Sequence, residues 1–351
     1  MAQRAGALAS PHRAFWDGLT AGARRAEESA GTDVRQILVG DVRLELRFAG
    51  NSVREAIFPA LQHLERLGED SPAVVINLWD SAETGVAPPP SPFDLSDLAS
   101  RGEMAPDPDG PIRVLCLPDA PVFMAWNRDD AEAVVWVRDS ASIPGHELAS
   151  PLRTLLQWML EPLGVFPVHA ASVAREPGGV LLAGFSGAGK STTSVACLER
   201  GFTFAGDDYV ALTGIDAPRA LSLYSTVKLK GHGLELLQGV PGAPRGKPIK
   251  GVSKEVLYLG EYRPELIRAD IPLRAIVLPS HRVATGVRRT SPANSLRALA
   301  APSILAIPQN GHGTMRYLAA LVAALPSYEI GLDGDLDRVA RELAALCEGP
   351  T

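Results

Sequence analysis

The sequence has too few cysteines for a protein that depends on disulfides. Among its 351 residues, only Cys116, Cys197 and Cys347 are cysteines. Three cysteines far apart along the chain match neither a disulfide framework nor the spacing of zinc ligands. The pattern predicts a protein of the reducing cytoplasm.

Long apolar runs and an excess of basic residues are also absent. No stretch of about 18 uninterrupted apolar residues occurs, and the N-terminal residues lack the apolar core of a signal peptide. The formal net charge is -6, whereas nonspecific nucleic-acid binding requires a basic face. We therefore expect neither a membrane partner nor a nucleic-acid partner. Hydrophobic residues make up 46% and charged residues 21%, which is typical of a folded globular protein.

The length exceeds that of a usual single domain, and the patterns along the chain predict three parts. Residues 1–32 have no strong apolar stripe and predict an N-terminal extension, either a loosely held helix or a frayed terminus. Residues 33–148 predict a smaller α+β domain whose role is not indicated. Residues 149–351 predict an α/β domain that carries the chemistry.

In the smaller domain, alternating apolar residues around Gly40-Asp41 predict a β-hairpin. Apolar residues at helical spacing predict a helix from Val53 to Leu67 that ends at Gly68. A proline-rich loop is expected over 82–112. The expected strands, the last three in a meander, are Ala73–Trp79, Ile112–Cys116, Val122–Trp126 and Ala133–Val137.

The second part begins with an apolar helix over Pro151–Leu160. A strand–turn–strand unit, a glycine-rich loop, a helix and another strand should follow. The predicted elements are the strands Val168–Ala174 and Val180–Ala183, the helix Lys190–Arg200 and a strand that ends near Asp207.

The glycine-rich loop reads GFSGAGKS from Gly184 to Ser191 and satisfies the P-loop pattern G-x-x-x-x-G-K-[ST]. It follows a predicted strand and precedes a predicted helix, which is the context that the motif requires. Closely spaced glycines let backbone N–H groups surround a phosphate at a helix N-terminus. Lys190 adds a positive charge for the outer phosphates, and the Ser191 hydroxyl can ligate Mg²⁺.

The motif therefore predicts a nucleoside triphosphate with Mg²⁺ as cofactors, and ATP is the triphosphate that we expect from the family resemblance described below. Two alternatives are a chance match and a loop that binds nucleotide only to stabilise or regulate the protein. The expected nucleotide-binding residues are Gly184, Ser186, Gly187, Ala188, Gly189, Lys190, Ser191 and Thr192.

Two adjacent carboxylates, Asp207 and Asp208, end an alternating apolar stretch about sixteen residues after the P-loop. A neighbouring parallel strand would place its C-terminal end there, and ligands of open α/β sheets bind at such ends. One carboxylate can hold Mg²⁺ while the other accepts the proton of an attacking hydroxyl. The alternative is a turn that merely caps the next segment.

Three further features have both a functional and a structural interpretation. His169, flanked by apolar residues, is either a core histidine with a backbone partner or a contact of the transferred phosphate or of the carboxylate pair. Lys228 and Lys230 alternate to one face, which lines either a substrate cleft or a wetted sheet surface. The basic segment 243–251 is either a loop that closes on phosphates or a surface loop.

Three blocks together resemble the C-terminal catalytic domain of HPr kinase/phosphorylase and of HPr-kinase-related bacterial serine kinases. In chain order they are V-H-A-A-S-V, G-V-L-L-A-G-F-S-G-A-G-K-S-T and R-G-F-T-F-A-G-D-D-Y-V. The similarity covers roughly residues 165–345 and is strongest over 165–210. It implies a P-loop kinase fold that resembles phosphoenolpyruvate carboxykinase. It also implies that His169 is the active-site histidine, Asp207 the base and Asp208 the metal-side carboxylate beside Ser191.

The sequence departs from HPr kinase/phosphorylase in two places. Thr192 follows the P-loop serine where a glutamate is typical, and no Arg-Gly phosphorylase signature occurs near Arg245. Phosphorylase activity and HPr as the substrate are therefore not carried over.

The resemblance predicts ATP-dependent transfer of the γ-phosphoryl group to a hydroxyl, with a serine of a protein or peptide as first choice and Lys190 stabilising charge. A small-molecule kinase and a nucleotide-sensing module without turnover remain alternatives. A homo-oligomer remains one option, because HPr kinases assemble as hexamers.

Overall fold

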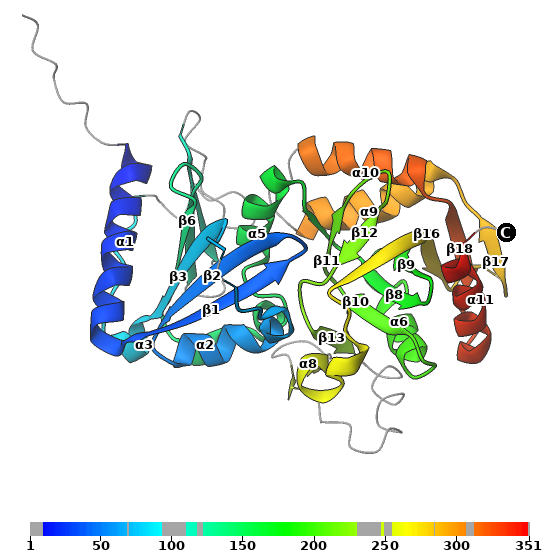
Figure 1. Cartoon of the computed structure of the whole chain (residues 1–351), viewed down its shortest axis with the longest axis horizontal. Coiled ribbons are helices and arrows are strands. Elements are labelled where there is room, and N and C mark those ends of the chain that lie inside the picture. The colour runs from blue at the N-terminus through cyan, green and yellow to red at the C-terminus, as the bar shows by residue number, and fades with distance from the viewer. Residues whose placement is uncertain are drawn as a thin grey trace, which may run out of the picture. The chain divides into compact units, whose positions relative to one another are not determined.

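The computed structural model describes residues 10–68, 70–92, 110–117, 122–229, 247–248, 255–283, 285–306 and 312–349. The fold is mixed α/β, with three sheets among the described residues (Figure 1). The chain forms two compact units, and the sequence patterns placed the boundary near residue 148. The described residues of Met1–Gln36, Arg43–Ala56 and Leu67–Ile143 belong to the first unit, and those of Ile37–Val42, Ile57–Arg66 and Pro144–Thr351 to the second.

Most of a six-stranded sheet lies in the first unit, in the order β1-β2-β3-β6-β5-β4. Strands β2, β3 and β6 are parallel, whereas β6, β5 and β4 form an antiparallel meander. The predicted hairpin, buried strand and three-stranded meander are confirmed. The strands are β1 (Thr32–Val39), β2 (Val42–Ala49), β3 (Val74–Asp80), β4 (Ile112–Leu117), β5 (Val122–Asn127) and β6 (Glu132–Val137).

The N-terminal residues form a well-packed helix, α1 (Pro11–Ala30), capped by the Ser10 side chain. The expectation of a loosely held helix or frayed terminus is wrong for these residues. Its packed face includes alanine and glycine, so the sequence shows little apolar stripe. Gly22 illustrates this, because a Cβ there would lie 3.1 Å from the Trp79 ring. Its buried residues are Phe15, Trp16, Leu19, Thr20, Gly22, Ala23 and Ala26.

The helix predicted over 53–67 is also wrong in extent. The α-helix α2 (Ser52–Ile57) stops early, and two 3₁₀ turns follow it over Phe58–Ala60 and Gln62–Leu64. Pro59 has no backbone N–H and cannot continue α-helical hydrogen bonding, which explains the change. The shorter elements α3 (Ser81–Thr84) and α4 (Gly145–Leu148) and a 3₁₀ turn over Ser140–Ser142 occur later.

The second unit is built around a nine-stranded sheet with the path β10-β8-β9-β16-β12-β11-β7, where β18 pairs with β16 and β17. Its centre is parallel, because β16 pairs in parallel with both β9 and β18. The strands are β7 (Phe166–Val168), β8 (Ala171–Arg175), β9 (Gly178–Leu182), β10 (Thr203–Gly206), β11 (Val210–Thr213), β12 (Arg219–Leu221), β16 (Asp270–Ser280), β17 (Val287–Arg289) and β18 (Ser327–Gly331).

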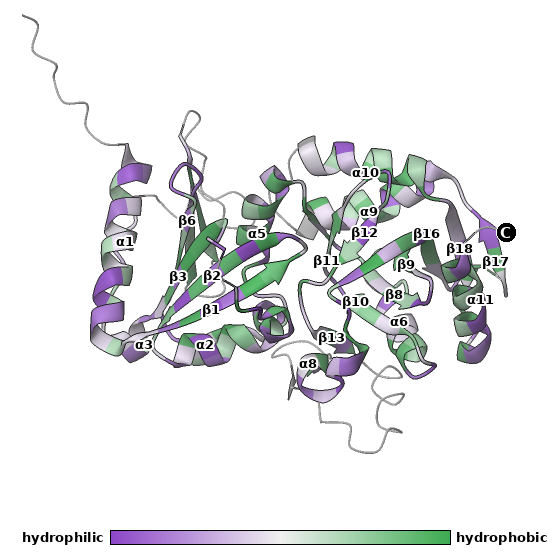
Figure 2. Ribbon diagram, viewed as in Figure 1, coloured by the Kyte–Doolittle hydropathy of each residue, from purple (hydrophilic) through white to green (hydrophobic). Residues whose placement is uncertain are grey.

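Helices cover both faces of this sheet. Along β9, Leu181 packs in a cluster with residues of α9 and α10, while its neighbour Leu182 packs in a second cluster with residues of α11. Successive strand residues point to opposite faces, so the two clusters define the two layers of helices. Both α1 and α11 carry polar and apolar residues, as expected of helices with one buried face (Figure 2). The helices are α5 (Arg153–Leu160), α6 (Lys190–Leu198), α8 (Leu259–Tyr262), α9 (Pro292–Ala306), α10 (His312–Ala324) and α11 (Leu336–Glu348), with 3₁₀ turns over Glu161–Leu163 and Pro264–Leu266.

A third, small sheet has the order β13-β15-β14, with β13 (Thr226–Leu229), β14 (Lys247–Pro248) and β15 (Glu255–Tyr258). Lys228 lies on β13. Lys230 and all of the basic segment 243–251 except Lys247 and Pro248 lie outside the described residues. None of the described helices is both long and apolar enough to cross a membrane.

Two predictions near the P-loop need correction. The strand expected over Val168–Ala174 is two strands, because β7 pairs with β11 while β8 pairs with β9 and β10. His169 and Ala170 form the break between them. Strand β10 is not a parallel neighbour of the P-loop strand, since β8 lies between β10 and β9 and is antiparallel to both. Strands β10 and β9 nevertheless run in the same direction and end at the same edge.

Candidate functional site

The P-loop connects the end of β9 to the start of α6. Gly189 precedes the helix with a φ of 99°, a left-handed conformation that favours glycine. A Cβ at this position would lie 2.3 Å from Leu332 Cδ1, so the Leu332 side chain would have to shift to admit one. The Thr193 N–H donates to Gly189 O at 2.9 Å as α6 begins. The first N–H groups of a helix have no partner within it, and here they lie where a phosphate is expected.

Lys190 is buried, and its ammonium remains at the loop. Nζ donates to Gly184 O at 2.7 Å and lies 3.2 Å from His169 Nε2. An ammonium cannot accept a hydrogen bond, so His169 Nε2 must be the acceptor and Nδ1 must carry the imidazole proton. The protonated Nδ1 then faces Asp208 Oδ1 at 3.4 Å. His169 therefore links the P-loop lysine to the carboxylate pair.

The main-chain position of His169 is set by α9. Its N–H donates to Ser303 Oγ at 2.9 Å, and the Ser303 hydroxyl in turn donates to Leu299 O at 2.6 Å. The imidazole also meets the Tyr209 ring edge to face, with the ring centroids 5.3 Å apart. These contacts hold the imidazole between Lys190 and Asp208.

Asp208 is held by a second lysine. Lys228 Nζ donates to Asp208 Oδ2 at 2.7 Å and to Ser150 Oγ at 3.3 Å. Burial acts to raise the pKa of Asp208, but the positive charge of Lys228 and the adjacent His169 outweigh it and hold this pKa well below its usual range. Asp208 therefore stays ionised.

Asp207 has the opposite environment, although it is the adjacent residue. Its side chain is almost completely buried, and burial together with the negative charge of Asp208 raises its pKa from 3.8 to about 6. Asp207 Oδ1 makes no hydrogen bond with a described residue. The Ser191 hydroxyl lies close enough to lower the pKa of Asp207, without a hydrogen bond of normal length to Oδ1.

A tight turn separates the two carboxylates. Asp208 has a φ of 69°, which is rare for a residue other than glycine, and the Tyr209 N–H donates to Asp207 O at 2.8 Å. Strained backbone of this kind is often found at functional sites. The turn gives the two adjacent side chains different surroundings.

A cavity of about 230 Å³ collects these side chains, and we name it the transfer cavity. Asp208 lines it, whereas Asp207 does not and lies buried beside it. Of the predicted nucleotide-binding residues, only Gly184 is not part of the lining. The transfer cavity is lined by His169, Phe185, Ser186, Gly187, Ala188, Gly189, Lys190, Ser191, Thr192, Asp208, Lys228, Leu229 and His281.

The sequence patterns did not indicate three residues near this cavity: Ser150, Tyr209 and His281. His281 follows β16 directly, and β16 is the parallel neighbour of the P-loop strand. Parallel strands end at one edge of a sheet, so His281 could have been proposed had the pairing been known. Nothing in the local sequence marks Ser150 or Tyr209.

The donor atoms suit a magnesium–nucleotide complex. The Ser191 hydroxyl and the carboxylates of Asp207 and Asp208 are oxygen donors, which Mg²⁺ prefers, and Asp207 Oδ1 lacks a partner. In the part of the chain that the structure describes, no three His, Cys, Asp or Glu side chains converge as a metal site. In P-loop magnesium binding, phosphate oxygens and water complete the coordination.

Comparison with known proteins adds little to this geometry. No family model matches the chain, and no curated protein matches it. One solved structure that it matches is the Hpr(Ser) kinase/phosphatase from Coxiella burnetii, with 13% identity and a TM-score of 0.29. The match covers 52% of this chain and 93% of that chain. At this TM-score the similarity carries no argument about function.

Proposed function

We propose that this protein is an ATP-dependent kinase that transfers the γ-phosphoryl group to a hydroxyl, with a serine of a protein or peptide as the acceptor. The observation that carries the proposal is the continuous set of contacts from Lys190 through His169 and Asp208 to Lys228 beside the P-loop. Phosphoryl transfer requires positive charge at the outer phosphates, a carboxylate for the metal and a carboxylate for the acceptor proton. All these groups lie in or beside the transfer cavity.

The two carboxylates have different chemical properties. With a pKa of about 6, Asp207 can accept a proton near neutral pH, as a general base must. Asp208 stays ionised and, with the Ser191 hydroxyl, would hold Mg²⁺, which neutralises charge on the transferred group when bound. Lys190 would leave Gly184 O and His169 to meet the outer phosphates, since the P-loop lysine contacts them.

One feature of the geometry favours the opposite division of roles. Asp208 lines the cavity but both of its oxygens already face His169 and Lys228, whereas Asp207 Oδ1 is unpartnered and near Ser191. Asp207 would then be the Mg²⁺ ligand, and Asp208 would accept the proton of the acceptor hydroxyl. The metal dependence of the two asparagine variants distinguishes these assignments.

The test compares wild type, Lys190→Ala, Asp207→Asn and Asp208→Asn for Mg²⁺–ATP binding and for transfer of labelled γ-phosphate to serine peptides. We expect Lys190→Ala to lose binding, and Asp207→Asn to lose transfer while binding ATP with wild-type magnesium dependence. A raised magnesium requirement in Asp207→Asn but not in Asp208→Asn would exchange the two roles.

Two other functions remain as alternatives to serine kinase activity. A small-molecule kinase would transfer phosphate to a metabolite hydroxyl but not to peptides. A nucleotide sensor would bind ATP in wild type and in Asp207→Asn alike and transfer phosphate to no acceptor. The wild-type assay with both acceptor classes distinguishes them.

A further inference from the structure

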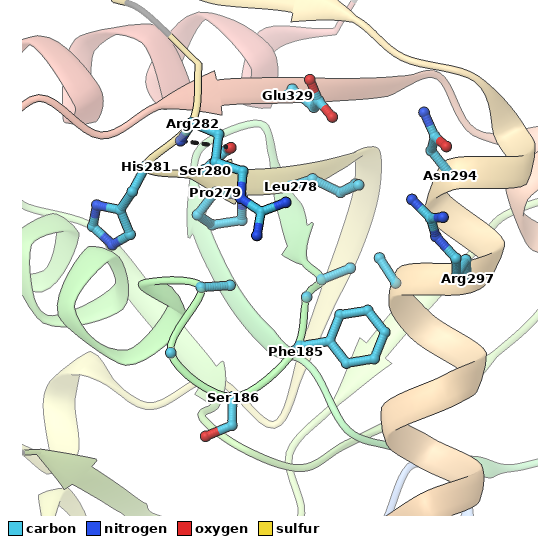
Figure 3. A pocket seen from close by; sticks show the side chains of 15 residues that line it. Phe185, Ser186, Leu278, Pro279, Ser280, His281, Arg282, Asn294, Arg297 and Glu329 are labelled. Carbon is cyan, nitrogen blue, oxygen red and sulfur yellow. Dashed lines mark hydrogen bonds between the residues drawn. The ribbon is translucent and has the colours of Figure 1, made fainter.

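A second cavity, of about 400 Å³, is also lined by the first half of the P-loop (Figure 3). We name it the arginine cavity. It shares Phe185, Ser186, Gly187, Ala188 and His281 with the transfer cavity, so the two cavities flank the same loop. Its remaining lining residues are Ala183, Gly184, Leu278, Pro279, Ser280, Arg282, Asn294, Arg297, Ala298 and Glu329.

Two arginines from different elements face this cavity. Arg282 follows β16 and extends into the cavity, and Arg297 reaches it from α9 (Figure 3). In the described part of the chain, neither guanidinium has an ion-pair partner. The carboxylate in the lining, Glu329, is already bound by Arg288, whose Nε donates to Oε2 at 2.8 Å. The cavity therefore presents two positive charges that are not neutralised.

The location identifies which end of a bound nucleotide this cavity would meet. The P-loop lysine contacts the β- and γ-phosphates, and Lys190 Nζ now lies at Gly184 O. The γ-phosphate would lie where Lys190, Ser191 and Asp208 converge in the transfer cavity, and the arginine cavity adjoins that position because residues 185–188 line both cavities.

Resting on the proposed kinase function, we propose that the arginine cavity binds the anionic group of the acceptor, a carboxylate or phosphate carried close to the reacting hydroxyl. Arginine binds both groups with paired, charge-assisted hydrogen bonds, and two arginines select against a neutral acceptor. The ring of Phe185, which is 48% exposed, offers an apolar wall for the acceptor's carbon chain. An acceptor anchored there would extend along residues 185–188, which line both cavities, and bring its hydroxyl into the transfer cavity.

The test measures binding by calorimetry with a non-hydrolysable ATP analogue and Mg²⁺ present. One arm compares glycerate with glycerol, and the other compares a serine peptide flanked by glutamates with its glutamine counterpart. The arm that shows the charge preference identifies the acceptor as a small hydroxy acid or an acidic peptide. We expect the anionic probe to bind at least about tenfold more tightly than its neutral partner.

Arg282→Gln and Arg297→Gln should each weaken binding of the anionic probe about tenfold. The affinities for the neutral probe and for the nucleotide should not change. Arg316→Gln is the matched control, because it removes an exposed arginine from the neighbouring helix α10. Equal binding of charged and neutral probes in both arms would overturn the proposal. Loss of nucleotide affinity in the two arginine variants would also overturn it, because the cavity would then serve the nucleotide.

The same titrations in Lys190→Ala distinguish failure of this inference from failure of the kinase proposal. If wild type binds no nucleotide, the proposed function fails. A charge preference that persists in Lys190→Ala and disappears with Arg282→Gln would still establish the anion site. If Lys190→Ala loses the preference for the anionic probe and the two arginine variants keep it, the anion binds at the P-loop and the inference is overturned.

Discussion

Lys228 Nζ lies 2.7 Å from Asp208 Oδ2, and this ion pair is largely shielded from solvent, with side-chain exposures of 11% and 24%. The two residues are on different elements, since Asp208 follows β10 and Lys228 lies on β13. The pair contributes to the different protonation behaviour of the adjacent aspartates, because Lys228 keeps Asp208 ionised, and burial together with the charge of Asp208 raises the pKa of Asp207.

The first prediction concerns the stability of this ion pair. Asp208→Asn leaves a largely shielded lysine without its carboxylate, and Lys228→Met leaves a largely shielded carboxylate without its lysine. Each single variant should lower the free energy of unfolding by about 3 kcal/mol, and the double variant by clearly less than the sum. Urea unfolding at pH 7 gives the free energy of unfolding of wild type, of the two single variants and of the double variant. Strictly additive losses would show that the two residues do not stabilise each other.

The second prediction is that Asp207→Asn makes the protein more stable at pH 8. The folded-state pKa of Asp207 is about 6, above its ordinary 3.8, so between these values the folded state binds more protons than the unfolded state. The contribution of Asp207 to the free energy of unfolding should therefore fall as pH rises through this window, by on the order of 3 kcal/mol in total. Asparagine has no charge to bury and avoids this loss.

The measurement is chemical unfolding of wild type and Asp207→Asn at pH 4 and pH 8. Asp216→Asn, which changes an exposed aspartate in the same unit, is the matched control. We expect the variant's advantage at pH 8 to shrink towards zero at pH 4. An equal difference at both pH values would contradict the assigned environment of Asp207.

The third prediction is a pH dependence of catalysis. A general base must be deprotonated to work, so kcat/KM for phosphoryl transfer should rise with pH and level off above a midpoint near pH 6. Transfer rates between pH 5 and pH 8.5 at saturating Mg²⁺ measure it, with nucleotide binding followed in parallel as a control. A flat profile across that range would remove Asp207 from the role of base.

The fourth prediction concerns the backbone of the P-loop. Gly189→Ala introduces a Cβ 2.3 Å from Leu332 Cδ1, which displaces that side chain, and the φ of 99° strains the backbone of an alanine in the loop. Gly201→Ala is the matched control at the other end of α6, because φ is 82° but no atom lies within 4 Å of the new Cβ. We expect Gly189→Ala to weaken ATP binding more than tenfold.

Gly201→Ala should leave ATP affinity unchanged while lowering the free energy of unfolding by roughly 1 kcal/mol, the cost of a left-handed alanine. Fluorescent ATP titrations and urea unfolding of both variants separate the two effects. Equal ATP affinity in Gly189→Ala and wild type would contradict the phosphate-binding conformation assigned to this loop.

The local sequence pattern was sufficient to predict those elements whose formation depends only on residues close together in the chain. The hairpin around Gly40-Asp41 and the strand–loop–helix unit of the P-loop follow from alternation and glycine placement, which act over a few residues. The same patterns failed for the helix beyond Ile57, where Pro59 interrupts it, and for α1, whose buried face includes small residues.

The sequence by itself determined that a histidine, a P-loop motif and two carboxylates follow one another along the chain. Tertiary structure alone decided that Lys228 pairs with Asp208, that Asp207 is buried, and that Arg282 and Arg297 face one cavity. These relationships join strands and helices far apart in the chain, and burial and electrostatic fields depend on that packing. No local spacing rule encodes them, because pKa values and cavities are properties of the assembled fold.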